Sequence, residues 1–203
     1  MKAIKTAIVR LLSRIVGSTG IAEPERYSIV QEAAVLVPVY RRTDGQLMLV
    51  LVRRTERGIH GGQIAFPGGK RIPEDHTPLD TALRESQEEI GLLPQNVEIL
   101  EHLPVIETRT TGFRIHPFLA RVARPREWKL ERKEIVEVLE IPISDFADPH
   151  AHGEEIRHLP SASRGEAAEA RRICFYHVGP HKVWGATYRI LKPLLPRLIG
   201  GEW

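Results

Sequence analysis

Apolar positions along this chain follow two periods, and the change between them predicts a mixed α/β architecture. Residues Gln31 to Tyr40 and Leu47 to Arg53 are apolar and β-branched, and Asp44-Gly45 between them is a turn signal, so they predict a β-hairpin. Further strands are predicted at Val97 to Leu103, Arg114 to Val122, Ile135 to Ile141 and Arg172 to Val178.

A helical period replaces the strand period after residue 76. Thr77 is suited to the N-cap, Pro78 to the first helical position, and Asp80 completes an approximate capping box. Gly91 supplies the left-handed residue that ends the helix after Ile90. The face predicted to be buried consists of Leu79, Ala82, Leu83, Ser86 and Ile90.

The C-terminal half has a weaker pattern. Ser144 to Ala147 predicts a short helix, and Lys182 to Leu191 predicts a longer one that Pro193 and Pro196 kink or end. Residues 148 to 170 have no convincing period, which indicates a long loop or lid. Strands mixed with helices favour an α/β fold, an α/β/α sandwich around a mixed β-sheet.

The N-terminal segment differs from the rest in charge. Residues 1 to 22 carry four basic residues and no acid, with apolar residues at helical spacing, so they predict a basic amphipathic helix. We expect residues 1–27 to form this helix and a linker, and residues 28–203 to form a single domain. Packing on the domain or on a second subunit, as in a homodimer, is favoured over contact with an anionic membrane or a role as a transit peptide.

Composition excludes several classes of protein. The 203 residues suit one domain, and 42% hydrophobic with 27% charged residues is ordinary for a soluble protein. The 29 basic residues are balanced by 26 acidic ones and lack aromatic interleaving, which argues against nucleic-acid binding. The single cysteine, Cys174, excludes an intrachain disulfide and is expected to be a small buried hydrophobe. With no secretory or membrane-spanning run, we expect a cytoplasmic protein.

Three carboxylates, Glu85, Glu88 and Glu89, share a narrow arc of the predicted helix. Like charges three and four residues apart oppose helix formation, so a merely solvated face is a poor explanation. A bound divalent cation would remove the conflict, and magnesium prefers such oxygen ligands. Upstream, the tight Phe66-Pro67-Gly68-Gly69 turn lets backbone amides approach a ligand.

Gly69, Asp75 and the stretch Arg84 to Leu92 together resemble the Nudix box, G-x5-E-x7-R-E-U-x-E-E-x-G-U with U aliphatic. Asp75 replaces the first Glu, with one extra residue before Arg84, and Ser86 occupies an aliphatic position. The resemblance implies a Nudix hydrolase, which cleaves a nucleoside diphosphate linked to another group. It also implies Mg2+ or Mn2+ held by the glutamates Glu85, Glu88 and Glu89.

The segment from His60 to Gly69 is similar to the H-x-G-Q-x-x-F-P-G-G segment of the coenzyme A pyrophosphatase branch. The extra residue before Arg84 and the Val183 to Thr187 stretch continue this similarity. Coenzyme A or acyl-coenzyme A would then give 3',5'-ADP and a phosphopantetheine product. The branch signature L-L-T-x-R-S/A with a second Arg is altered, since Arg54 stands at the S/A position and Gly58 replaces that Arg. Cations that could compensate are Arg54, Arg57 and Arg71.

Roles are assigned to the site residues as follows. Arg84 lies one turn before Glu88 and can orient it by a salt bridge, and the base is Glu88 or a later carboxylate, with Glu134 preferred to Glu107 and Glu137. His150, His152 and His158 lack the spacing and partner cysteine of a zinc site. The predicted substrate-binding residues are His60, Gln63, Gly68, Gly69, Arg53, Lys70 and Arg114.

Two rival functions stay open at this stage. A Nudix pyrophosphatase for ADP-ribose or dinucleoside polyphosphates is kept open by Gly58. A non-catalytic nucleotide-binding protein of the same fold is opposed by the three intact carboxylates, which a binding module does not need.

Overall fold

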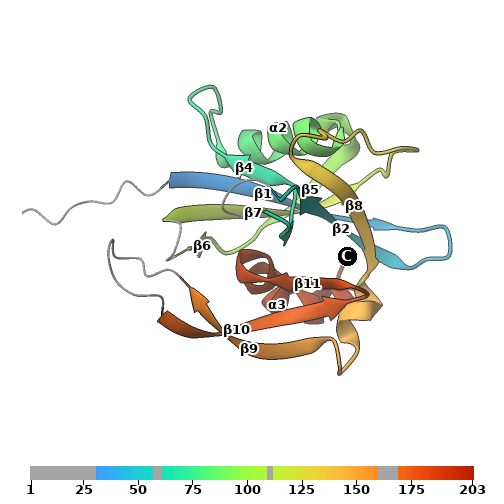
Figure 1. Ribbon diagram of the computed structural model, residues 1–203. Helices are drawn as coiled ribbons and strands as arrows, with labels where there is room; N and C mark the ends of the chain where they lie inside the picture. Colours follow the sequence, from blue (N-terminus) through green and yellow to red (C-terminus); the bar gives the residue numbers. More distant parts are fainter. Residues whose placement is uncertain (1–30, 57–60, 109–111, 160–168) are drawn as a thin grey trace, which may run out of the picture.

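A computed structural model describes residues 31–56, 61–108, 112–159 and 169–203. A central mixed sheet has the strand order β3-β2-β1-β7-β5, with β4 beside β1, β6 beside β7 and β8 beside β2 (Figure 1). β1 and β7 run parallel, and the other pairs are antiparallel. The strands are β1 (Gln31–Arg41), β2 (Leu47–Arg54), β3 (Ile64–Ala65), β4 (Gly68–Lys70), β5 (Val97–His102), β6 (Ile106–Glu107), β7 (Phe113–Val122) and β8 (Ile135–Pro142).

Strand alternation sends neighbouring residues of β1 and β2 into two separate cores. Leu36 and Val50 belong to the core under α2 (Pro78–Ile90), whereas Val37 and Leu51 belong to the core under α3 (Gly185–Ile199). Figure 1 shows these helices on opposite faces of the sheet. The α/β prediction with a mixed sheet between layers is therefore confirmed, and so is the predicted hairpin, in which Val39 faces Leu49.

The ends of α2 are formed as the sequence predicts. The Thr77 hydroxyl accepts from the Asp80 amide at 3.2 Å, and the Asp80 carboxylate accepts from the Thr77 amide at 2.8 Å. Gly91 closes the helix with φ 71°. Ser86, at the unusual position of the motif, is fully buried and donates to the Ala82 carbonyl at 2.7 Å, which satisfies its hydroxyl within the core.

The other layer departs from the predictions. Part of the predicted loop at 148 to 170 is strand β9 (His152–Leu159), which pairs with β10 (Glu169–Val178). The predicted helix at Lys182 to Leu191 is wrong at its start, because β11 (His181–Trp184) completes a three-stranded sheet before α3 begins. Short 3-10 helices η1 (Pro94–Asn96) and η2 (Ile143–Ala147) connect other strands.

α3 also continues through both of its prolines, so they do not end it, and the alternative that they kink it stays a prediction. A proline inside a helix costs about 3 kcal/mol. Four buried leucines of the same helix offset that cost by packing against the core: Leu191, Leu194, Leu195 and Leu198.

The predicted N-terminal helix, residues 1 to 22, lies outside the described residues, so it stays a prediction together with the proposed domain boundary. Within the part of the chain that the structure describes, no helix is long and apolar enough to span a bilayer.

Candidate active site

The Gly68-Gly69 segment lies against α2 because β4 pairs with β1, where Gly69 faces Ala34. Gly68 has φ 152°, and a Cβ there would lie 2.3 Å from the Ala34 carbonyl oxygen, so only glycine fits. A Cβ on Gly69 would lie 2.5 Å from the Glu85 carboxyl group. Gly68 is therefore required by the neighbouring backbone of β1, whereas Gly69 is required by the space that the Glu85 carboxyl group occupies.

Glu89 is the buried member of the acidic cluster, with 2% of its surface exposed, so the acidic arc of the helix is not uniformly exposed to solvent. Its carboxylate accepts from the Gly68 amide at 3.0 Å and from Arg54 Nη1 at 2.8 Å. Burial raises the pKa of Glu89 to about 7, although Arg54 and the Gly68 amide oppose the rise. The fold therefore holds the Glu89 side chain where burial disfavours its charged form.

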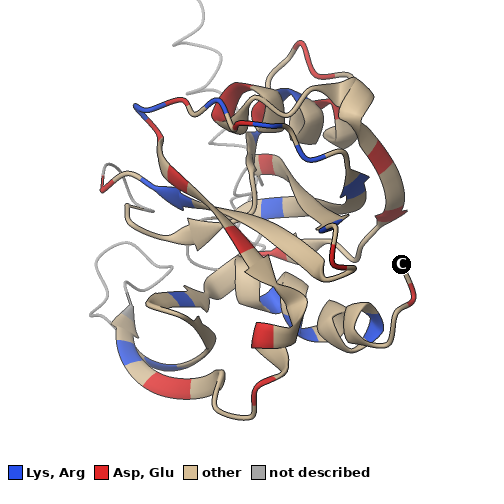
Figure 2. Ribbon diagram, turned by 90° about the vertical axis from the view of Figure 1, so that its right-hand side faces the viewer, with Lys and Arg blue, Asp and Glu red and all other residues tan. Residues whose placement is uncertain are grey.

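Glu85 and Glu88 differ in exposure, at 17% and 59% of their side chains. Burial raises the pKa of Glu85, the Arg84 charge lowers it, and the charges of Glu88 and Glu134 raise it further. Glu134 precedes β8, is 54% exposed and lies 3.4 Å from Arg54 Nη2. The fold thus brings Glu134 to the same site as Glu85 and Glu89, with Glu88 at the exposed rim (Figure 2, where α2 at the top carries red acidic segments).

Arg84 contacts three carboxylates of the cluster. Its Nε and Nη2 donate to both oxygens of Asp75 at 2.9 Å, and its Nη2 also donates to the Lys70 carbonyl at 3.1 Å. Its Nη1 lies 3.0 Å from both Glu85 and Glu88. Asp75 is buried, and the hydrogen bonds from Arg84 hold the pKa of its carboxyl well below the usual range. Asp75 therefore fixes Arg84, which in turn orients two carboxylates.

Arg53 and Arg54 are consecutive, yet strand alternation puts them on opposite faces of the sheet. Arg54 lies between Glu89 and Glu134 on the α2 face. Arg53 pairs with Glu137 at 2.5 Å and lines a cavity of about 400 Å3 beside the second sheet. Of the predicted compensating cations, Arg71 is engaged with the carbonyls of Asp75 and His76.

The donor set of the cluster fits a hard divalent cation. Its members are all carboxylates, and Gly69 leaves room beside Glu85 that a side chain would fill. Burial is the main cause of the raised pKa values of Glu85 and Glu89, and neighbouring carboxylates add to it. In the described residues no three His, Cys, Asp or Glu side chains already converge at metal-binding geometry.

The remaining predicted substrate residues lie in different places. Gln63 lines the cavity with Arg53, and its carbonyl accepts from the Arg54 amide at 3.0 Å. Lys70 Nζ lies 5.1 Å above the Phe113 ring. Arg114 pairs with Glu32 and Glu107, which takes Glu107 away from the acidic cluster. His60, together with Gly58 and Arg57, lies outside the described residues.

Three cavity residues escaped the sequence prediction: Arg157, Lys182 and Trp184. They come from β9 and β11, which were predicted as loop and helix. The Gly179-Pro180 dipeptide is a turn signal that could have indicated the β10–β11 hairpin. Trp184 lay in a stretch similar to the coenzyme A branch, but sequence gave it no role.

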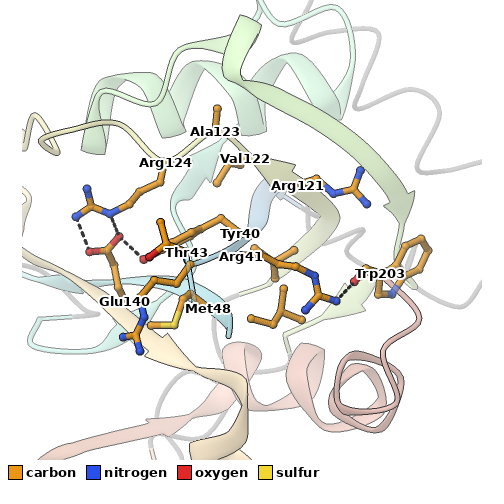
Figure 3. Close-up of a pocket in the computed structure, with 13 residues that line it drawn as sticks. Tyr40, Arg41, Thr43, Met48, Arg121, Val122, Ala123, Arg124, Glu140 and Trp203 are labelled. Atoms are coloured by element: carbon orange, nitrogen blue, oxygen red, sulfur yellow. Dashed lines mark hydrogen bonds and ion pairs between the residues drawn. The ribbon is translucent and has the colours of Figure 1, made fainter. Parts of the chain in front are cut away.

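A second cavity, of about 860 Å3, lies at the opposite ends of β1 and β2 (Figure 3). Several of its polar groups hydrogen-bond to one another. Arg124 donates to both oxygens of Glu140 at 2.6 and 2.9 Å, Tyr40 donates to the same carboxylate at 2.9 Å, and Arg41 donates to the Trp203 carbonyl at 2.7 Å. This larger hollow is remote from the acidic cluster, so size alone does not locate the chemistry.

Comparison with known proteins gives consistent results. The chain matches the NUDIX domain over residues 30–160. It is 33% identical over 168 residues to a Salmonella paratyphi B protein named Uncharacterized Nudix hydrolase NudL, covering 81% of each chain. The Salmonella newport protein of that name matches equally. The solved structure of a MutT/nudix family protein from Enterococcus faecalis superposes with TM-score 0.55 and 15% identity, covering 96% of this chain and 69% of that one, which supports the fold.

Proposed function

Because this chain belongs to the Nudix family of pyrophosphohydrolases, we propose that it hydrolyses the pyrophosphate bond of coenzyme A or acyl-coenzyme A. The products are 3',5'-ADP and a phosphopantetheine or its acyl derivative. Water adds to one phosphorus atom and the bridging P–O bond breaks, so no oxidant or second substrate is needed. A cytoplasmic location suits these substrates.

One observation carries the proposal. A cluster of carboxylates on the α2 face and a cavity with cationic and aromatic walls on the other face adjoin the same end of β2. Arg54 belongs to the first group and Arg53 to the second. A pyrophosphate with a bulky nucleotide on one side needs both a site for its charge and space for its base.

Mg2+ or Mn2+ would be held by Glu85, Glu89 and Glu88. When bound, such an ion supplies charge neutralisation to the pyrophosphate and makes water a better nucleophile at neutral pH. Glu89 is the firmest of the three, because the Gly68 amide already fixes one of its oxygens. The other oxygen of Glu89 accepts from Arg54 and, because it has a second lone pair, would still be able to bind such an ion.

The remaining residues orient and move protons. Arg84 positions Glu88 through the 3.0 Å contact, itself fixed by Asp75. Glu134 is the proposed general base, because it is exposed to solvent beside Glu85 and Arg54. The Arg54 guanidinium can also donate to phosphate oxygens, and it would then compensate for the second Arg of the branch signature, which is Gly58 in this chain. Lys70 and Arg114 are weaker phosphate candidates because other groups engage them.

A turnover panel tests the proposal. Coenzyme A, acyl-coenzyme A, ADP-ribose, NADH and diadenosine polyphosphates are incubated with the protein and Mg2+ or Mn2+, and products are separated by chromatography. We expect coenzyme A or its acyl derivative to have the highest kcat/KM. Cleavage of ADP-ribose alone would reject coenzyme A, and no cleavage by folded, metal-loaded protein would favour the non-catalytic alternative.

One observation favours the alternative substrate class. Gly58 removes a cation expected for the 3'-phosphate of coenzyme A, and ADP-ribose or dinucleoside polyphosphates lack that group. An enzyme for these substrates would cleave dephospho-coenzyme A as well as coenzyme A.

A further inference from the structure

The cavity of about 400 Å3 lies between the central sheet and the second sheet, and its walls come from segments that are far apart in sequence. The end of β2 and the Gly61 to Ile64 segment contribute Arg53 and Gln63, while β9 and β11 contribute Arg157, Lys182 and Trp184. Alternation in β11 explains this placement, because Val183 points into the core and its two neighbours point the other way.

The wall formed by the second sheet carries the Trp184 ring and two cations, Arg157 and Lys182. The Arg157 guanidinium lies 4.8 Å from the centre of the Trp184 ring. Glu155 contacts Arg157 and Lys182, each at 2.5 Å, so one carboxylate serves two cations. Glu56 also lines the cavity, but it is exposed and its carboxylate lies beside Gly62. This wall therefore has two cations for one carboxylate, and a bound anion could share Arg157 and Lys182 with Glu155.

The cavity is within reach of the acidic cluster. Gln63 lines the cavity and Gly68 donates to Glu89, and the five residue steps from one to the other span at most about 18 Å when fully extended. A buried hydrogen bond of 3.2 Å from the Thr187 hydroxyl to the Ile64 carbonyl ties α3 to this segment. This bond fixes α3, which follows the second sheet, against β3, the strand that precedes Gly68 and Gly69.

We propose that this cavity is the nucleotide subsite, in which the Trp184–Arg157 pair stacks the adenine and Arg157 with Lys182 binds a phosphate monoester apart from the scissile pyrophosphate. Bases stack on aromatic rings and on guanidinium planes, and a guanidinium matches phosphate geometry. The ligand class is a 3'-phosphorylated adenine nucleotide. This inference rests on the proposed function only in taking coenzyme A as substrate.

Binding of 3',5'-ADP tests the subsite without turnover. Isothermal titration calorimetry on the full chain, with no divalent metal, compares 3',5'-ADP with 5'-AMP. We expect the first to bind at least about tenfold more tightly. Arg157→Ala and Lys182→Ala should each abolish most of that preference, and Trp184→Ala should weaken both ligands while Trp184→Phe retains them. Arg172→Ala, an exposed arginine of the same sheet outside the cavity, is the matched control and should bind as the parent protein does.

Equal loss of both ligands in Arg157→Ala and Lys182→Ala, or no loss in either, would overturn the subsite. A kinetic arm separates this outcome from failure of the proposed function. If the parent cleaves coenzyme A and the Arg157→Ala/Lys182→Ala double variant keeps its preference for coenzyme A over dephospho-coenzyme A, the subsite is wrong and the function stands. If the parent cleaves no coenzyme A yet shows the expected binding pattern, the substrate is wrong and the subsite stands.

Discussion

On the α2 face of the central sheet two carboxylates, Glu89 and Asp75, are buried, whereas on the α3 face the cations Lys182 and Arg157 are partly exposed around a cavity. The side chains of Glu89 and Asp75 are 3% and 4% exposed, compared with 28% for Lys182 and 38% for Arg157. The first face fixes a few carboxylates, and the second offers cations that can exchange partners. This difference is what separates a reaction centre from a recognition surface.

The two faces also differ in how far apart in sequence their contacts lie. Asp75 and Arg84 are 9 residues apart, and Gly68 and Glu89 are 21 apart. The bond that aligns the cavity side, from Thr187 to Ile64, spans 123 residues. These contacts of the acidic centre are thus fairly local, although Arg54 joins it to Glu89 across 35 residues and to Glu134 across 80, while the cavity exists only when the whole chain has folded.

The largest expected effect is on the acidic face. Glu89→Gln should lower kcat/KM by at least about 10³-fold, because loss of a metal ligand removes several kcal/mol of transition-state stabilisation. The fold should persist, since burial already disfavours the charged form of Glu89. Steady-state kinetics and circular dichroism measure the two quantities, with the exposed Glu127→Gln as control. Undiminished turnover would show that Glu89 binds no metal.

A second prediction concerns the support of that face. Asp75→Asn should lower the free energy of unfolding by about 2–3 kcal/mol at neutral pH, because it removes the buried carboxylate charge that pairs with Arg84. The folded state lowers the pKa of Asp75 below its ordinary 3.8, so its contribution is full above that pH and declines as pH falls. The gap between variant and parent should therefore narrow in acid. Urea unfolding at several pH values measures it, and a gap that widens in acid contradicts the assignment. The exposed Asp145→Asn is the control.

A third prediction contrasts Gly68 and Gly69, which we expect to affect stability and metal affinity, respectively. Gly69→Ala should raise the Mn2+ concentration for half-maximal activity by about 10- to 100-fold, since its Cβ would displace Glu85. Gly68→Ala should instead destabilise the fold, because its Cβ would meet the Ala34 carbonyl. Metal titrations and thermal unfolding of both variants measure this contrast. Identical behaviour of the two would refute the separate roles.

The smallest expected effect is on the cavity side. Thr187→Val should cost about 1 kcal/mol of unfolding free energy by deleting the buried bond to Ile64. Because this bond aligns the cavity and not the carboxylates, KM should rise more than kcat falls. Thr187→Ser keeps the hydroxyl and should behave as the parent protein does. A fall in kcat with KM unchanged would place Thr187 with the reaction centre instead.

Local patterns in the sequence determined α2, its two caps, the hairpin and the group of carboxylates, since each depends on residues a few positions apart. The motif also indicated the two glycines beside the helix, although they lie in strand β4 and not in a turn. It did not indicate that Glu89 is buried, because that burial depends on the docking of β4 and β2 against α2.

The sequence predicted most of β10, but only the tertiary structure decided β9, β11 and the partners of the two arginines. The β9 residues have too many charges to predict a strand, and they adopt one because β10 supplies the hydrogen-bonding partner. α3 keeps two prolines because its leucines are buried. The sequence determined which residues could perform the chemistry, and long-range packing decided which of them meet, because strand pairing and burial outweigh the local preferences of a segment.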